Sequence, residues 1–171
     1  MKVLLIDNYD SFTYNLVHYV QGFDVEVDVF FNDQIPFENL SNYDKIILSP
    51  GPGLPEQAGE MNKLISLTYS KIPILGVCLG FQALTEFFGG EIFNQNIVKH
   101  GIKETCFVDT ASKLFKEIPK TINVGLYHSW AAKMDTFPKD LVQTAISENE
   151  IIMAFEHKKF NVCGVQFHPE S

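Results

Sequence analysis

GVCLG at residues 76–80 places one cysteine, Cys78, between two glycines, after an apolar run and before residues that favour helix. This order is typical of a tight strand-to-helix turn that presents a nucleophile, with cysteine in place of serine. At the start of a helix, Cys78 would lie near unpaired backbone N–H groups, which favour the thiolate. Taken alone, the pattern fits an inert buried cysteine just as well.

Apolar runs and helical patterns alternate around this turn as far as residue 90. The pattern predicts strands at 2–7, 25–31, 45–48 and 72–77. It predicts helices at 12–21, 60–69 and 79–88, the last of them ended by Gly89-Gly90. Such alternation predicts an α/β fold with an open, mostly parallel sheet and helices on both faces, as in flavodoxin-like proteins. Beyond residue 90, four shorter segments predict a small antiparallel β section and a return to the main sheet: 104–108, 141–147, 151–157 and 162–168.

The length and composition predict one ordinary domain. The chain has 171 residues, 46% of them apolar, which is enough to bury a sizeable core. No apolar run reaches the roughly 18 residues of a membrane span, and the apolar start has no cleavage-like region, so we expect a cytoplasmic protein without a membrane partner. The cysteines are odd in number and widely spaced, which predicts neither a disulfide framework nor structural zinc: Cys78, Cys106 and Cys163.

The charge pattern argues against a nucleic-acid partner. The net charge is -8, whereas sequence-independent binding of nucleic acid depends on clustered cationic side chains against phosphates. All 13 cationic residues are lysines, so no bidentate guanidinium clamp is available. An anionic ligand would therefore be bound by backbone N–H groups or by lysine.

A base and a group to orient it occur near the end of the chain, in VQFHPE at residues 165–170. A thiolate nucleophile normally needs both. Pro169 pushes the residue before it towards extended geometry, so the side chains of His168 and Glu170 should project to one side of the backbone. Only the tertiary fold could bring this pair to Cys78, and the motif by itself also fits a solvated chain end.

The loop SPGPG at residues 49–53 follows a predicted strand, which is where open α/β sheets bind ligands. Its prolines carry no N–H, so Gly51 and Gly53 are the possible donors to a developing oxyanion. Leu79, directly after the cysteine, could offer a second N–H. The two Pro-Gly pairs also fit a rigid turn or a phosphate-binding nest.

The other polar candidates carry weaker signals. Asp7 and Asp10 flank a strand end and could bind a cation, but capping of the following helix explains them more simply. Burial or packing in a loop is expected for His128. None of the remaining histidines has the spacing of a metal site: His18, His100 and His157. We therefore expect no metal and no cofactor.

Five segments together resemble the triad-type glutamine amidotransferases, in the family's order and over nearly the whole chain: IDNYDSFTYNLVHY (6–19), ILSPGPGLP (47–55), GVCLGFQ (76–82), YHSW (127–130) and GVQFHPES (164–171). The opening DNYDSFTYN resembles the corresponding segment of one branch of this family, the small subunits of anthranilate synthase and aminodeoxychorismate synthase. The resemblance implies that Cys78 is the nucleophile, His168 the general base and acid, and Glu170 the group that orients the imidazole. It also implies contacts to glutamine or its oxyanion from Gly51, Pro52, Gly53, Leu79, Gln82 and the backbone of Ser129 and Trp130.

The implied reaction is hydrolysis of glutamine through a thioester on Cys78. The ammonia would pass to a larger chorismate-binding synthase subunit, component I, in a hetero-oligomer. Three alternatives remain open: service to aminodeoxychorismate synthase instead of anthranilate synthase, a stand-alone Cys-His-Glu amide hydrolase, and a non-catalytic flavodoxin-like regulatory module.

The sequence departs from the family pattern at four places. Phe81 stands where histidine is usual, Leu126 where arginine is usual, and Ile102 where lysine is usual. These departures put the family's usual contacts to substrate or partner in question. The chain also stops at Ser171, whereas relatives continue. We therefore expect the domain of residues 1–171 to be truncated at its C-terminus or excised from a fusion with a further C-terminal domain.

Overall fold

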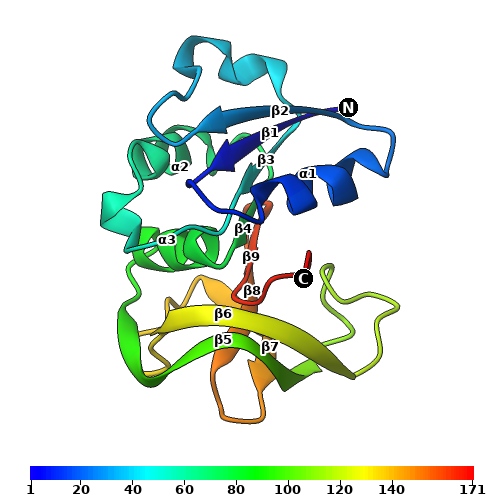
Figure 1. Cartoon of the computed structure of the whole chain (residues 1–171), viewed down its shortest axis with the longest axis vertical. Helices are drawn as coiled ribbons and strands as arrows, with labels where there is room; N and C mark the ends of the chain where they lie inside the picture. The colour runs from blue at the N-terminus through cyan, green and yellow to red at the C-terminus, as the bar shows by residue number, and fades with distance from the viewer.

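A mixed β-sheet of nine strands forms the centre of the computed structural model, which describes residues 1–95 and 101–171 (Figure 1). The strands lie in the order β2-β1-β3-β4-β9-β8-β7-β5-β6. They are β1 (Lys2–Asp7), β2 (Glu26–Phe31), β3 (Lys45–Leu48), β4 (Ile74–Val77), β5 (Ile92–Val108), β6 (Thr121–Ala132), β7 (Leu141–Ser147), β8 (Ile152–His157) and β9 (Val162–Val165). The helices are α1 (Thr13–Gln21), α2 (Met61–Thr68) and α3 (Leu79–Phe87), with short 3₁₀ helices η1 (Phe37–Asn42) and η2 (Pro55–Gln57).

The first five strands in this order are parallel and form the α/β half of the sheet. Alternate residues of β1 point to opposite faces. Val3 and Leu5 join the apolar cluster that includes α1, whereas Leu4 and Ile6 join the one that includes α2 and α3. Figure 1 shows α1 on one side of these strands and α2 and α3 on the other. The predicted α/β fold, with helices on both faces of a parallel sheet, is confirmed.

Helix α3 ends where the glycine pair predicted. Its last residue is Phe87, and Gly89 then adopts φ 94°, a conformation that glycine adopts without strain. The Gly89 N–H donates to the carbonyl of Glu86 at 2.9 Å, and the Gly90 N–H donates to that of Thr85 at 2.9 Å. Of the helices in the part of the chain that the structure describes, none is long and apolar enough to cross a membrane.

The antiparallel half continues the same sheet through β8, β7, β5 and β6, and β9 returns beside β4 as expected. Strand β6 was not predicted from the sequence. Its inward positions include Val124, Leu126 and His128, so a histidine and the intervening Gly125 interrupt the apolar alternation. Strand β9 is shorter than predicted and ends at Val165, which leaves the motif histidine beyond the strand.

Two glycines allow helix α3 to approach the parallel strands closely. A Cβ atom placed on Gly80 would lie 2.5 Å from the carbonyl oxygen of Leu48 in β3. A Cβ atom on Gly76 would lie 2.5 Å from the carbonyl carbon and oxygen of Gly80. Neither position has room for a side chain, so the first turn of α3 rests against the carboxyl ends of β3 and β4.

We expect Gly80→Ala to lower the free energy of unfolding by about 3 kcal/mol, because the added methyl group would force backbone apart from backbone. Gly22→Ala is the matched control, since its Cβ would meet nothing closer than the Tyr19 carbonyl oxygen at 3.2 Å. Urea denaturation followed by circular dichroism measures both variants. An equal loss of unfolding free energy in the two variants would show that the close approach at Gly80 does not limit the size of the side chain there.

Candidate active site

Cys78 occupies the turn between β4 and α3. Its backbone has φ 51° and ψ -99°, a sparsely populated conformation for a residue with a side chain. The Cys78 N–H donates to the Val165 carbonyl of β9 at 2.8 Å, and the Gln82 N–H donates to the Cys78 carbonyl at 3.0 Å. The side chain is buried, with 5% exposure. The strained turn at a strand end is the geometry that the GVCLG pattern predicted.

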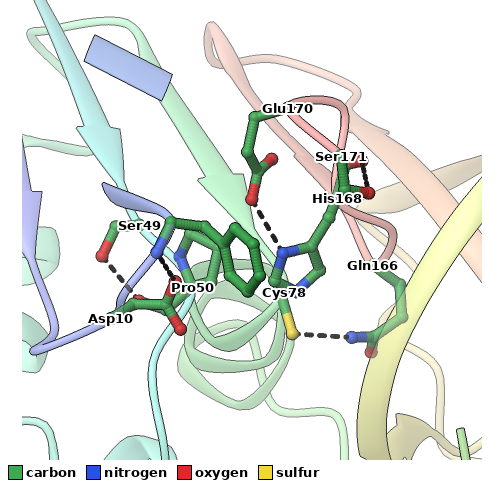
Figure 2. Close-up of polar contacts among 9 residues, drawn as sticks. Asp10, Ser49, Pro50, Cys78, Gln166, His168, Glu170 and Ser171 are labelled. Atoms are coloured by element: carbon green, nitrogen blue, oxygen red, sulfur yellow. Dashed lines mark hydrogen bonds and ion pairs between the residues drawn. The ribbon is translucent and has the colours of Figure 1, made fainter. Parts of the chain in front are cut away.

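His168 and Glu170 form a buried pair beside this turn. The imidazole Nδ1 lies 2.7 Å from Glu170 Oε1, and the two side chains are 3% and 0% exposed. Because the carboxylate accepts the Nδ1 proton, the neutral imidazole carries its lone pair on Nε2. Within residues 1–95 and 101–171, no protein group hydrogen-bonds to that buried Nε2. Figure 2 shows the imidazole between the Glu170 carboxylate and the Cys78 sulfur, the order that the predicted triad requires.

The imidazole is fixed in place by strand β6 and by two aromatic rings. The backbone N–H of His168 donates to the Gly125 carbonyl of β6 at 3.1 Å. The Tyr127 ring lies 5.0 Å from the imidazole centroid, and the Phe12 ring meets it edge-on at 6.1 Å. These contacts fix the imidazole of a residue that lies beyond the end of β9.

Burial raises the pKa of the Cys78 thiol to about 12. The negative charges of Asp10 and Glu170 also raise this pKa, whereas hydrogen bonds from the Leu79 N–H and the Gln166 side chain lower it. The helix N-terminus alone therefore does not produce a thiolate in this structure, contrary to the tendency expected from the sequence. The resemblance assigns removal of the Cys78 proton to His168, and this role stays a prediction.

Gln82 lies one helical turn after the nucleophile and contacts the Trp130 backbone. The Gln82 side chain is 3% exposed, and its Nε2 donates to the Trp130 carbonyl at 3.0 Å and to Gln166 Oε1 at 3.3 Å. The Trp130 carbonyl also accepts from His128 Nδ1 at 2.8 Å. Ser129 precedes Trp130 in β6 and is half-buried. The direct contact of Gln82 with the Trp130 backbone ties α3 to β6; their contacts with glutamine stay predictions.

The SPGPG loop packs against the cysteine turn. A Cβ atom on Gly51 would lie 2.5 Å from Asn8 Cβ and 2.9 Å from Leu79 Cδ2, so only glycine fits at this contact. Gly53 adopts φ 78°. Pro52, Leu79 and Asn8 help to line a hollow of about 330 Å³ beside the loop. The structure thus brings the loop to the nucleophile, and the role of the Gly51, Gly53 and Leu79 N–H groups as oxyanion donors stays a prediction.

Asp7 and Asp10 stabilise the turn before α1, but the expectation that they cap this helix is wrong, because its N-cap residue is Phe12 and no side chain caps it. Asp7 Oδ1 accepts from the Thr13 hydroxyl at 2.8 Å and from the Asp10 N–H at 3.1 Å. Asp10 Oδ1 accepts from the Phe12 N–H at 2.8 Å. Burial raises the pKa of Asp10, which also interacts electrostatically with His168 and Glu170. Asp10 is therefore a second carboxylate beside the nucleophile, together with Glu170, a position that the sequence did not reveal.

The described histidines outside the predicted triad show no metal-binding arrangement. Among residues 1–95 and 101–171, no cluster of three His, Cys, Asp or Glu side chains could hold a metal ion. His128 is buried in β6, and His18 lies in the last turn of α1. His157 Nδ1 accepts from the N–H groups of Lys159 and Phe160. His100 lies outside the described residues.

The departures from the family pattern have different surroundings. Phe81 is fully buried in the core under α3, where its ring centroid lies 5.1 Å from that of Phe155. Leu126 is fully buried in β6 beside the residues that hold the histidine. Ile102 is 42% exposed in β5. Two of the three therefore contribute apolar packing, and none belongs to the triad.

Gln166 is the functional candidate that the sequence reasoning missed. Its Nε2 lies 3.7 Å from the Cys78 sulfur, and its side chain is fully buried. A signal was present in the sequence, because the two-residue spacing that relates His168 to Glu170 extends back to Gln166. The aromatic partners of the imidazole carried no comparable signal, since they come from separate segments of the chain.

Comparison with known proteins places this arrangement in a family. Residues 4–171 match the glutamine amidotransferase class-I family. Anthranilate synthase component 2 of Lactococcus lactis is 42% identical over 171 residues, which cover 99% of this chain and 86% of that protein. The same-named protein of Methanocaldococcus jannaschii is 45% identical over 173 residues, covering 99% and 85%. A multifunctional tryptophan biosynthesis protein of Phycomyces blakesleeanus is 42% identical over 174 residues, covering 100% of this chain but 23% of that protein.

Solved structures share the fold. A protein from Thermoplasma acidophilum, provisionally assigned to GMP synthase, superimposes with a TM-score of 0.89 at 26% identity, covering 100% of this chain and 85% of that one. A glutamine amidotransferase from Thermotoga maritima gives a TM-score of 0.80 at 20% identity, covering 99% and 76%, and supports the fold alone. With the family match spanning nearly the whole sequence, the chain belongs to the class-I glutamine amidotransferases.

Proposed function

We propose that the protein is the glutaminase subunit of a chorismate-using synthase, as in anthranilate synthase component II. It would hydrolyse glutamine through Cys78 and deliver the ammonia to component I. The observation that carries this proposal is the meeting of Cys78, at the end of β4, with the His168–Glu170 pair beyond β9. The kinship with anthranilate synthase component 2 proteins supports the assignment to this branch.

In the first half of the reaction, His168 Nε2 takes the Cys78 proton, and Glu170 stabilises the imidazolium that forms. The thiolate attacks the side-chain carbonyl carbon of glutamine to form a C–S bond. The carbonyl oxygen becomes an oxyanion, for which the N–H groups of Leu79 and the SPGPG loop are the candidate donors. His168 then gives its proton to the nitrogen, the C–N bond breaks, and ammonia leaves a γ-glutamyl thioester on Cys78.

In the second half, His168 takes a proton from water as the water oxygen adds to the thioester carbon. The C–S bond breaks, its electron pair returns to sulfur, and glutamate is released. The proton held by His168 then neutralises the Cys78 thiolate. These steps balance with the triad, water and glutamine alone.

Backbone groups and Gln82 would hold the substrate. The chain has no arginine, so the glutamine carboxylate cannot rely on a guanidinium. The backbone of Ser129 and Trp130 in β6 and the loop residues Gly51 and Gly53 are the expected contacts. We place the reaction in the cytoplasm, where a cysteine nucleophile stays reduced, and we treat residues 1–171 as one amidotransferase domain.

Replacement of His168 by Ala should lower glutamine hydrolysis about a thousandfold, because it removes the base proposed to take the Cys78 proton. His157→Ala is the matched control and should keep nearly full activity, since that ring lies in β8 and contacts the backbone of Lys159 and Phe160. Ammonia release, measured with the synthase partner present, distinguishes them. A glutamine-analogue alkylator should label Cys78 alone, and similar activity in the two histidine variants would refute the assignment.

Asp10→Asn should increase the alkylation rate of Cys78 at neutral pH by about threefold or more. The Asp10 charge raises the thiol pKa, so its removal lowers that pKa and increases the thiolate fraction at every pH below it. Asparagine keeps the side-chain oxygen that accepts from the Phe12 N–H. The control is Asp33→Asn, which removes an exposed carboxylate bonded to the Tyr9 hydroxyl. An unchanged rate in Asp10→Asn would exclude the electrostatic role.

Reconstitution with the synthase subunit tests which pathway the ammonia serves. When the protein is purified with its native partner and supplied with chorismate and glutamine, it should yield anthranilate, identified by mass spectrometry. Formation of aminodeoxychorismate would move the assignment to the other synthase of this branch. Cleavage of another γ-glutamyl amide, with no ammonia from glutamine even when the partner is bound, would overturn the proposal in favour of a stand-alone hydrolase.

A further inference from the structure

The side chain of Gln166 lies between the sulfur of the nucleophile and the side chain of Gln82. It is fully buried, and its Nε2 contacts the Cys78 sulfur at 3.7 Å, within reach of an N–H···S hydrogen bond (Figure 2). Its Oε1 accepts from Gln82 Nε2 at 3.3 Å. Its backbone N–H donates to the Met153 carbonyl of β8 at 2.8 Å. Both ends of the amide therefore meet polar partners, and the backbone is anchored to the neighbouring strand.

The direction of this amide is set by a chain of contacts that begins at a backbone carbonyl. The Trp130 carbonyl can only accept, so the end of the Gln82 amide that faces it at 3.0 Å must be the NH₂ group. That same NH₂ faces Gln166, which therefore presents its oxygen to Gln82 and its own NH₂ to the sulfur. The polarity is thus transmitted from β6 through α3 to Cys78.

We propose that Gln166 is a catalytic residue, whose Nε2 donates a hydrogen bond to the Cys78 sulfur and stabilises it as a thiolate, and that Gln82 is the positioning residue that aims this donor. The proposal rests on the assignment of Cys78 as the nucleophile of the proposed function. A hydrogen bond to an ionised acceptor is stronger than one to a neutral acceptor. The contact therefore favours the thiolate over the thiol.

The donor would act at both stages in which sulfur carries charge. It stabilises the thiolate that forms when His168 takes the Cys78 proton, before the C–S bond is made. It acts again when water has added to the thioester and the C–S bond breaks, because the electron pair then returns to sulfur. Between these stages the thioester sulfur is neutral and the hydrogen bond weakens. Because the hydrogen bond is stronger to the charged sulfur than to the neutral thioester sulfur, it accelerates both half-reactions.

The surroundings of the sulfur explain why such a donor is needed. Asp10, from the turn before α1, and Glu170, from the segment after β9, both place negative charge nearby and oppose the thiolate. His168 is the titratable base that faces it. Two donors work in the other direction, the Leu79 N–H of α3 and the Gln166 amide. If the Leu79 N–H turns to the substrate oxyanion, the Gln166 amide remains as the donor to sulfur.

The test measures thiolate formation directly, as the pH profile of Cys78 alkylation by iodoacetamide, with the modified residue identified by mass spectrometry. Gln166→Met keeps the length of the side chain and removes the donor. We expect its profile to move to higher pH and the rate at neutral pH to fall about tenfold. Gln82→Met keeps the Gln166 amide but frees its orientation. Its Cys78 alkylation rate at neutral pH should lie between that of Gln166→Met and that of the wild type.

Gln143→Met provides the matched control. Gln143 is an exposed residue of β7 whose Nε2 also lies beside a sulfur atom, that of Met134, at 3.1 Å. Its loss should leave the alkylation profile of Cys78 unchanged. A Gln166→Met protein with native circular dichroism and a wild-type profile would overturn the proposal. If that variant does not fold, a wild-type profile in folded Gln82→Met would overturn it.

The readout separates this inference from the proposed function, because alkylation requires neither glutamine nor the synthase partner. A shifted profile in Gln166→Met together with a wild-type protein that releases no ammonia would sink the proposed function and leave the role of Gln166 intact. Normal glutaminase activity together with an unshifted profile would sink the role of Gln166 alone.

Discussion

The site depends on a backbone contact between the first turn of α3 and strand β3. Gly80 lies so close to the Leu48 carbonyl that no Cβ atom fits, and Gly76 meets Gly80 in the same way. This contact places the helix N-terminus at the carboxyl ends of the parallel strands, where α/β sheets bind ligands. It also forces the chain to turn within one residue, Cys78. The neighbouring strand β9 then delivers the residues that follow it to the same edge of the sheet.

The chemistry of the site is a balance between burial and charge. Burial and the negative charges of Asp10 and Glu170 raise the pKa of the Cys78 thiol and so oppose its ionisation. The Glu170 carboxylate that opposes the thiolate also stabilises the imidazolium that makes it, so its net effect depends on where the proton lies. With His168 as the proposed base, the site favours a proton that moves between Cys78 and His168 over a permanently ionised nucleophile.

Sequence reasoning was most successful where the physical cause is local. The glycine spacing predicted the turn at Cys78, and the proline in HPE predicted the shared direction of His168 and Glu170, because both depend on a few adjacent residues. The meeting of these segments depends on β9 lying between β4 and β8, which no periodicity reveals. Strand β6 escaped prediction because His128 occupies an inward position. The role of Gln166 was missed for a similar reason, since it depends on Gln82 and on a carbonyl of that unpredicted strand.

The backbone of Cys78 also limits which nucleophiles this scaffold can carry. At φ 51° and ψ -99°, a side chain branched at Cβ would be a steric outlier, so threonine is disfavoured at this position before its reactivity is considered. Serine fits the space, but it would need a far stronger base than the thiol does. The backbone conformation of the turn thus disfavours threonine, and the acidity of the side chain then favours cysteine over serine.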